Sequence, residues 1–449
     1  MHFWPRRVIN GMREAAALGA CVLLTGCGGL PDPDGFEAAV IENAATLAAL
    51  TPATGDDAKS LSRNGLLLSP SVREAASRVS ASAEEVRVQR AALFPGLSLA
   101  GISGIISSGG GASHAVELSG TQLLFDGGNS RRAVQVADFN LQISYIAFQK
   151  AVDEAVVELL NAYDEVQTQS ELVGIYRRQH HAMRELETLV AARTESGAVS
   201  SSDLLEARKR LHSAAFLVND AELALAEAQD RLMLLSGQTK GGRHQLGAKS
   251  CKALGETDDL RTAHLELGRA QIALERAEKA VSPLLLLKPV LGGEIGLNKL
   301  PLGVNIDVRS DLLQGGALTA RANVARSNLA TAEARLGVVR LEDHVAENAL
   351  VRSLTAGDQK SAMLQRQIDL LSQTRELYRS QYADMGTRRI SELLDNEEEY
   401  YSRQAELIEL RSQLAGHRLD CAVRSRVLRR ELGLEGYSLY GFPLAVDFQ

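Results

Sequence analysis

The chain has 449 residues, of which 45% are hydrophobic but only 4% aromatic, and its formal net charge is −7. This charge gives no basic surface, so nucleic acid is not an expected partner. The middle of the chain is rich in Ala, Leu, Glu, Arg and Ser. Such a composition indicates long helices and argues against a β-sandwich or a doubly wound sheet.

The first 26 residues have the features of a lipoprotein signal peptide. A basic start is followed by the apolar run AAALGACVLLTGC, which is too short to span a bilayer as a mature helix. Leu24-Thr25-Gly26-Cys27 resembles a bacterial lipobox, and this resemblance implies cleavage before Cys27 and a lipid on that cysteine. A plain cleaved signal peptide with an incidental cysteine is the alternative. Residues 27–60 lack sustained periodicity, so we expect a lipidated, extended N-terminal arm.

The first repeat, residues 61–245, begins with a helix and a pair of strands. The helix starts at Ser69-Pro70 and ends before Pro95. Apolar and polar residues then alternate over about 97–125, which predicts two strands. Each strand would have the roughly ten residues that a tilted strand needs to cross a bilayer.

A long helical hairpin completes the first repeat. Gly127 and Gly128 follow the strands, and a helical pattern then continues to Gly197 near the hairpin tip. A helix of about 70 residues is roughly 100 Å long. The return helix has the 3-4 spacing of a coiled-coil seam. This seam consists of Leu204, Ala207, Leu211, Ala214, Val218, Ala221, Leu225, Ala228, Leu232 and Leu235.

The second repeat, residues 246–435, copies this order. Its strand pair is expected over about 286–312, and a second glycine pair, Gly315 and Gly316, stands 188 positions after the first. The second long helix should end at a hairpin tip near Gly386. Self-similarity at a fixed offset indicates an internal duplication.

The strands are expected to enter a membrane as part of a larger barrel. Val304, Ile306 and Val308 alternate with polar residues, which gives one face for lipid and one for water. Four strands cannot close a barrel, and unpaired sheet edges are not tolerated in hydrocarbon, so several copies must contribute strands. A soluble coiled-coil protein with two small hairpins is the alternative. The expected fold class is therefore mainly α, with a contribution to a β-barrel.

The end of the chain leaves one question open. The second return helix should run from Glu392 to near Gly433, with residues 436–449 as a C-terminal tail. If the first 26 residues are removed, Cys251 and Cys421 remain with Cys27 as the cysteines of the mature chain. They could form a disulfide in an oxidising compartment, or Cys421 could serve as a small buried apolar residue.

No enzyme motif, cofactor motif or metal-ligand set is recognisable in the sequence. The pair His180-His181 lacks a third ligand at a suitable spacing. We therefore expect a protein without a catalytic group, a cofactor or a metal site.

Three stretches together resemble the TolC family of bacterial outer-membrane efflux and secretion channels. They are LFPGLSL at residues 93–99, LFDGG at residues 124–128 and GTRRISELLD at residues 386–395, and the resemblance covers about residues 60–435. It implies a homotrimer whose strands form one barrel among outer-membrane lipids, with a helical tunnel in the periplasm. It also implies a periplasmic adaptor protein and an inner-membrane transporter of the RND or ABC class as partners.

The resemblance assigns a periplasmic gate to the second hairpin tip. Glu392 and Asp395 stand three residues apart on one helical face, and three copies would form an acidic ring that favours cations. Arg388 would hold the closed state by ion pairs, and Asp203 is the corresponding position in the first repeat. For each carboxylate the alternative is a solvated residue near a helix N-terminus.

The remaining glycines mark the ends of the tunnel helices. Gly197 and Gly386 would meet the adaptor, although glycine is also an ordinary helix cap. The pairs Gly127-Gly128 and Gly315-Gly316 would mark the bends from strand to helix, where the backbone requires unusual angles.

The sequence leaves several functions open. Small-molecule efflux and type I protein secretion are equally consistent with such a duct. A periplasmic adaptor lipoprotein is a rival from another class, but it should have one hairpin flanked by soluble β-domains rather than two repeats. A purely structural coiled coil of the cell envelope is the third alternative.

Overall fold

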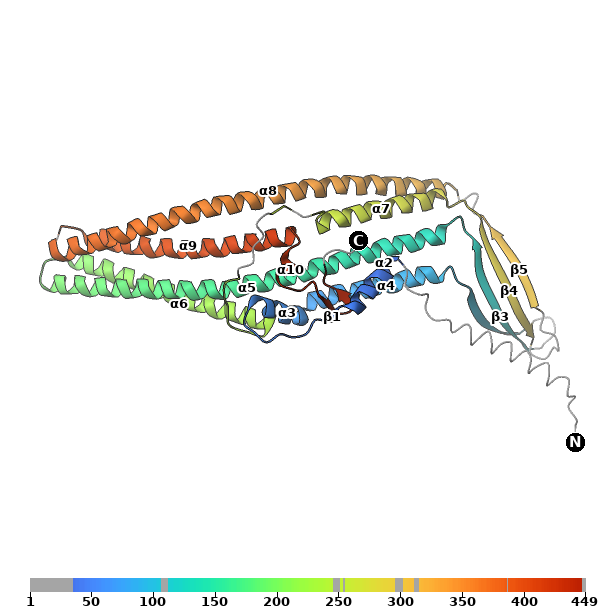
Figure 1. The fold of residues 1–449 in the computed structure, drawn as a ribbon, viewed down its shortest axis with the longest axis horizontal. Helices are drawn as coiled ribbons and strands as arrows, with labels where there is room; N and C mark the ends of the chain where they lie inside the picture. The colour runs from blue at the N-terminus through green and yellow to red at the C-terminus, as the bar shows by residue number, and fades with distance from the viewer. Residues whose placement is uncertain are drawn as a thin grey trace, which may run out of the picture. The chain divides into compact units, whose positions relative to one another are not determined.

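The computed structural model describes residues 35–105, 112–244, 251–252, 255–294, 302–310, 315–385 and 387–445. The chain divides into two compact units (Figure 1). Unit 1 contains Met1–Ala39, Ser80–Gln142 and Gly268–Ala330, and unit 2 contains Val40–Val79, Ile143–Leu267 and Thr331–Gln449. Within the described ranges, no helix is both long enough and apolar enough to span a membrane.

Unit 1 contains the predicted four-stranded sheet. Its strands are β2 (Gly96–Ile105), β3 (Ala112–Phe125), β4 (Leu284–Glu294) and β5 (Leu302–Arg309). They are all antiparallel, in the order β2-β3-β4-β5, so each repeat contributes one hairpin and β3 pairs with β4 across the duplication. The four strands predicted for this sheet are thus confirmed, although the residues that connect the two strands of each hairpin lie outside the described residues.

The two faces of this sheet differ in polarity. Register places Val304, Ile306 and Val308 of β5 opposite Pro289, Leu287 and Leu285 of β4, which gives an apolar face. All three β5 side chains of this face are about 62–64% exposed. The other face contains the polar residues Lys288, Asn305 and Asp307 together with the apolar residues Leu286 and Val290. The register shift between Leu123 and Phe125 is a β-bulge.

Both glycine pairs lie where the sequence predicts the bend from strand to helix. Gly127 and Gly128 have φ of 65° and 82°, and Gly315 and Gly316 have φ of 54° and 84°. L side chains rarely adopt these angles, which is why glycine suits all four positions. A Cβ at Gly127 would also collide with the side chain of Ser282.

Two long helices begin at these bends. They are α5 (Asn129–Glu195) and α8 (Ala317–Ser380), with 67 and 64 residues, or roughly 100 Å each. The shorter helices that precede the strands are α4 (Pro70–Ala91) and α7 (Asp258–Glu278). Pro70 occupies the first helical position, where its missing N–H costs nothing.

Unit 2 contains the two helical hairpins. Figure 1 shows α6 (Ser201–Ser236) running back beside α5, and α9 (Ile390–Arg424) beside α8. The alanines of the predicted seam on α6 are all buried. Near the tips, Leu186 and Val190 of α5 pack in one core with Leu393 and Leu394 of α9, so the two hairpins hold each other.

A disulfide ties the connection between the repeats to the end of α9. Cys251 and Cys421 are bonded, with their Cα atoms 4.4 Å apart, and both residues are buried. The pairing that the sequence left open is therefore formed, and Cys421 is at the same time a buried residue of α9.

The sequence analysis expected residues 27–60 to be extended, and this expectation is wrong for part of the range. The structure has helix α2 (Gly35–Thr46) in this range, and helix α3 (Ala58–Leu68) begins at its end. Glu37 of α2 is buried and forms ion pairs with Arg87 and Arg90 of α4. These ion pairs join the segment to a helix 50 residues later in the chain and stabilise it. Such stabilisation does not need a regular apolar pattern in the segment itself.

The end of the chain also differs from the expectation. Helix α9 ends at Arg424 instead of near Gly433, because Arg426 adopts a positive φ of 59° before the short helix α10 (Leu428–Glu431). Strands β6 (Tyr437–Leu439) and β7 (Phe442–Pro443) follow and form a sheet with β1 (Ala48–Ala49), in the order β1-β6-β7. Part of the expected tail is therefore packed.

Candidate functional site

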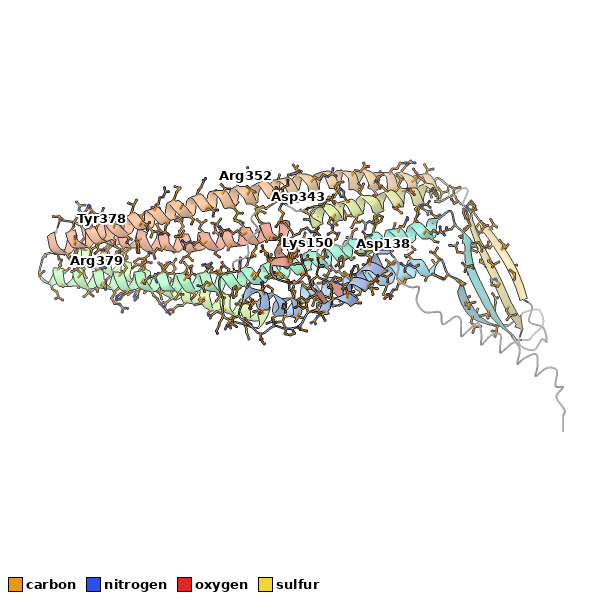
Figure 2. The ribbon with its side chains drawn as sticks, viewed as in Figure 1. Asp138, Lys150, Asp343, Arg352, Tyr378 and Arg379 are labelled. Atoms are coloured by element: carbon orange, nitrogen blue, oxygen red, sulfur yellow. A yellow bond between two sulfur atoms is a disulfide. The ribbon has the colours of Figure 1, made fainter. Side chains whose placement is uncertain are left out.

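The second hairpin tip has a compact polar network around Arg388. Its Nη1 lies 2.7 Å from Glu392 Oε2, and its Nε donates to Gln381 Oε1 at 2.9 Å. The guanidinium also stacks 4.1 Å from the centre of the Tyr378 ring. Figure 2 shows Tyr378 near this end of α8. Glu392 stands in the first turn of α9, where the helix dipole favours a carboxylate.

Asp395 has a different partner from Glu392. Its Oδ1 lies 2.9 Å from Arg210 Nη2, which belongs to α6. The same guanidinium also binds Glu206 of its own helix and Glu398 of α9. Arg210 therefore joins the return helices of the two repeats. Within one chain, the two predicted ring residues are each neutralised by a different arginine.

Asp203 lies in the cap at the start of α6. Its Oδ2 accepts a hydrogen bond from Ser200 Oγ at 2.8 Å, and its N–H donates to the same hydroxyl. This geometry is that of a helix N-terminus. Asp203 also contributes to the raised pKa of Tyr382, whose main cause is burial and which the positive charge of Arg193 opposes.

Tyr382 lies in a stretch of π-helix, Gln381–Met385, at the end of α8. A π-helix fits one extra residue into a turn of an α-helix. Tyr382 is 3% exposed, and the Arg193 guanidinium lies 4.8 Å from the centre of its ring. Arg193 also donates to the carbonyl of Ala383 at 2.8 Å. The first hairpin thus holds the π-helix of the second.

A buried ion pair near the tip was not anticipated. Glu397 of α9 is fully buried, and its Oε2 accepts a hydrogen bond from Arg375 Nε at 2.6 Å. Arg379 lies 3.6 Å from the other carboxylate oxygen. The signal was present in the sequence, because Glu397 follows the apolar residues Ile390 and Leu394 at heptad spacing.

The other predicted positions divide into two groups. Gly197 has φ of 74° after the last turn of α5, so it has the geometry of a helix cap. Gly386 and Cys27 lie outside the described residues.

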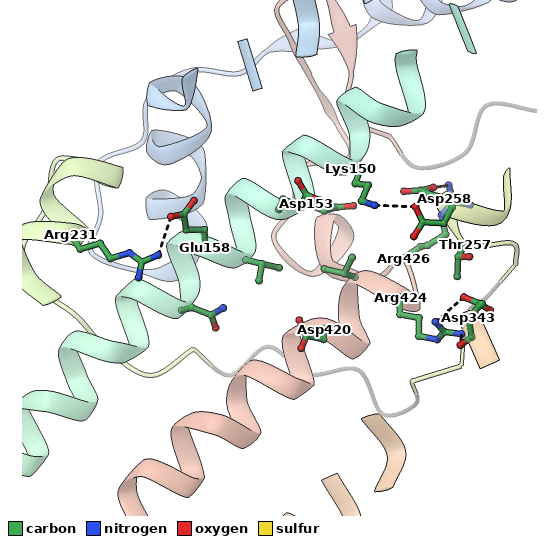
Figure 3. Close-up of a pocket in the computed structure, with 15 residues that line it drawn as sticks. Lys150, Asp153, Glu158, Arg231, Thr257, Asp258, Asp343, Asp420, Arg424 and Arg426 are labelled. Carbon is green, nitrogen blue, oxygen red and sulfur yellow. Dashed lines mark hydrogen bonds and ion pairs between the residues drawn. The ribbon is translucent and has the colours of Figure 1, made fainter. Parts of the chain in front are cut away.

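Unit 2 also contains a cleft of about 640 Å³ (Figure 3). Its lining consists of Lys150, Asp153, Glu154, Val157, Glu158, Asn161, Arg231, Thr257, Asp258, Asp259, Asp343, Asp420, Val423, Arg424 and Arg426. Most of these charges are paired: Lys150 Nζ lies 3.0 Å from Asp259, for example. The cleft contains none of the predicted site residues.

Comparison with known proteins shows which proteins the chain is similar to. The model of the family described as outer membrane efflux protein matches residues 61–238. Nodulation protein T of Rhizobium leguminosarum bv. viciae is 25% identical over 395 residues, which are 80% of either chain. The chain is therefore similar to outer membrane efflux proteins, and the resemblance found in the sequence is confirmed.

Solved structures of membrane proteins share the fold. The outer membrane protein VceC from Vibrio cholerae has a TM-score of 0.75 at 18% identity, covering 82% of this chain and 96% of its own. A membrane protein from Pseudomonas aeruginosa has a TM-score of 0.76 at 16% identity, covering 93% and 98%. At these identities the structural likeness concerns the fold, and the similarity to outer membrane efflux proteins supports an outer-membrane exit duct.

Proposed function

We propose that this protein forms a homotrimeric, lipid-anchored exit duct in the bacterial outer membrane. The observation that carries the proposal is the sheet of unit 1, which has one exposed apolar face and ends in β2 and β5 as edge strands. In hydrocarbon such edges must be paired, and pairing β5 of one copy with β2 of the next satisfies both. A periplasmic adaptor and an inner-membrane RND or ABC transporter would supply cargo and energy.

Exposed apolar residues on α6 and α8 support the assembly of copies side by side. The large apolar residues that are more than half exposed are Leu205, Phe216, Leu223 and Leu234 on α6, and Val324, Leu341, Val345, Met363, Leu370 and Leu377 on α8. Met363, Leu370 and Leu377 recur every seven residues, as coiled-coil contacts do. We infer that α8 of one copy packs against α6 of its neighbour, which would continue the tunnel wall.

The tip network supports a gate in which the first hairpin holds the second closed. Arg210 bridges α6 to Asp395 and Glu398 of α9, while Arg193 holds the π-helix after α8. Loss of these contacts would free α8 and α9 to move outward. Three copies of Glu392 and Asp395 would then supply the acidic ring at the entrance.

Single-channel conductance of the detergent-purified trimer in a planar bilayer tests this function. Arg210→Ala removes the bridge but keeps the acidic residues, so the open probability should rise. Glu392→Gln with Asp395→Asn removes the ring charge, so cation selectivity should fall. Arg231→Ala is the matched control, because it breaks a similar ion pair from α6 to Glu158 of α5. A purified, folded trimer without pores would refute the duct.

A further inference from the structure

Three charged side chains lie together on the polar face of β4 and β5. Asp307 Oδ2 is 2.8 Å from Lys288 Nζ and 2.8 Å from Arg309 Nη2. Arg309 Nε also donates to Asp307 Oδ1 at 3.2 Å. Because one carboxylate faces two cations, the cluster has one positive charge in excess.

The cluster lies at the end of the strands that continues into the helices. Arg309 is the last residue of β5, and its register partner Leu284 is the first residue of β4, directly after α7. Lys288 stands opposite Asn305 on the same face. Glu117 of β3 has the same orientation but pairs with Gly292, four residues further along β4, or about 13 Å away.

The positive charge is available to a ligand. Arg309 is 68% exposed, and Lys288 is 31% exposed. A guanidinium has five N–H donors, of which the contacts with Asp307 use two. Within the described part of the chain, no contact of Arg309 Nη1 is seen, so this side of the guanidinium can bind a carboxylate, sulfate or phosphate in the fork geometry that favours arginine.

The face of the sheet on which the cluster lies determines whether it would contact lipid or line the pore. Its face is opposite to the apolar face of Val304, Ile306 and Val308, and it continues over Ser119 and Ser98, whose hydroxyls are 2.7 Å apart. In the trimeric barrel of the proposed function, on which this step rests, the apolar face contacts lipid. The polar face then lines the pore.

We propose that three copies of Lys288, Asp307 and Arg309 form a cationic ring at the helix-side end of the barrel, which binds anionic groups of the passing cargo. The ring has six positive and three negative side chains. Rings of Arg and Lys favour anions, so this ring opposes in sign the acidic ring proposed for the periplasmic tip. Cargo with carboxylate, sulfate or phosphate groups would be held at this point of the pore.

Reversal potentials in a KCl gradient at about 0.1 M test the ring, because the Debye length there is about 10 Å. Lys288→Gln with Arg309→Gln should raise the ratio of K⁺ to Cl⁻ permeability, and Asp307→Asn should lower it, each by roughly two- to threefold. Lys288→Arg keeps the charge and is the matched control. Both shifts should disappear near 1 M KCl, where the Debye length is about 3 Å.

The outcomes separate this inference from the proposed function. Pores whose permeability ratio is the same in all variants would overturn the ring and leave the duct intact. Absence of pores in the wild-type trimer would overturn the duct itself. If the substituted chains form no pores, the ring is tested by adding tripolyphosphate to wild-type pores. Block of the current that weakens as the salt concentration rises supports the ring, and absence of block overturns it.

Discussion

The disulfide between Cys251 and Cys421 should stabilise the native chain strongly. It closes a segment with a sequence separation of 170 residues. Loop-closure entropy of the unfolded chain predicts a stabilisation of about 5 kcal/mol at 25 °C for a loop of this length. At 1.36 kcal/mol per factor of ten, the disulfide should form roughly several thousand times more favourably in the native protein than in the unfolded one.

Glutathione equilibrium measures this ratio directly. The fraction of disulfide is determined at defined ratios of reduced to oxidised glutathione, first for the native protein in detergent and then in guanidinium chloride. The double variant Cys251→Ser, Cys421→Ser controls for other reactive thiols. A native-to-unfolded ratio below about ten would correspond to less than about 1.4 kcal/mol and would refute the loop-closure reasoning.

Three further predictions concern stability, measured by circular dichroism during guanidinium or thermal unfolding in detergent. Arg429→Met leaves Asp153 buried without its bidentate partner, so the unfolding free energy should fall by about 3–5 kcal/mol, and an unchanged midpoint would contradict this. Gly127→Ala should cost about 1–2 kcal/mol from its positive φ alone, with the collision at Ser282 in addition, whereas Gly174→Ala within α5 should be nearly neutral or stabilising. Burial raises the pKa of Asp126, but hydrogen bonds from the first turn of α5 outweigh it, so the folded-state pKa is lowered. Its stabilisation should therefore be complete above the ordinary carboxyl value and be lost as the pH falls below that value through the lower folded-state pKa, so the stability difference from Asp126→Ala should shrink as the pH is lowered.

Regular patterns made the main elements predictable. The glycine pairs, the alternation in β5 and the alanine seam of α6 each depend on residues close in sequence, so their spacing carries the information. The sequence of β4, LLLLKPVLGGE, alternates poorly between apolar and polar residues. This strand still forms across Pro289, because it pairs with β3 on one side and β5 on the other. Its central position in the sheet outweighs its local propensity.

Contacts between distant residues could not be predicted in the same way. Helix α2 depends on Glu37 and two arginines of α4, and Arg210 binds carboxylates more than 180 positions away. No spacing rule connects such pairs. Glu397 left a local trace in the sequence, as one charge in an apolar stripe, but its partner Arg375 was visible only in the fold, as was the contact of Arg193 with the π-helix.

The small sheet of unit 2 has a consequence for the order of assembly. Ala48 and Ala49 of β1 pair in parallel with Tyr437 and Ser438 of β6, although almost the whole chain lies between them. Contacts of such sequence separation form late, because most of the chain must be ordered before the ends meet. If the chain is exported from its N-terminus, as the proposed function implies, this pairing cannot form until residues 437–443 have followed. During that interval the apolar stripes and strand edges would remain uncovered, so a periplasmic chaperone would be needed to bind them.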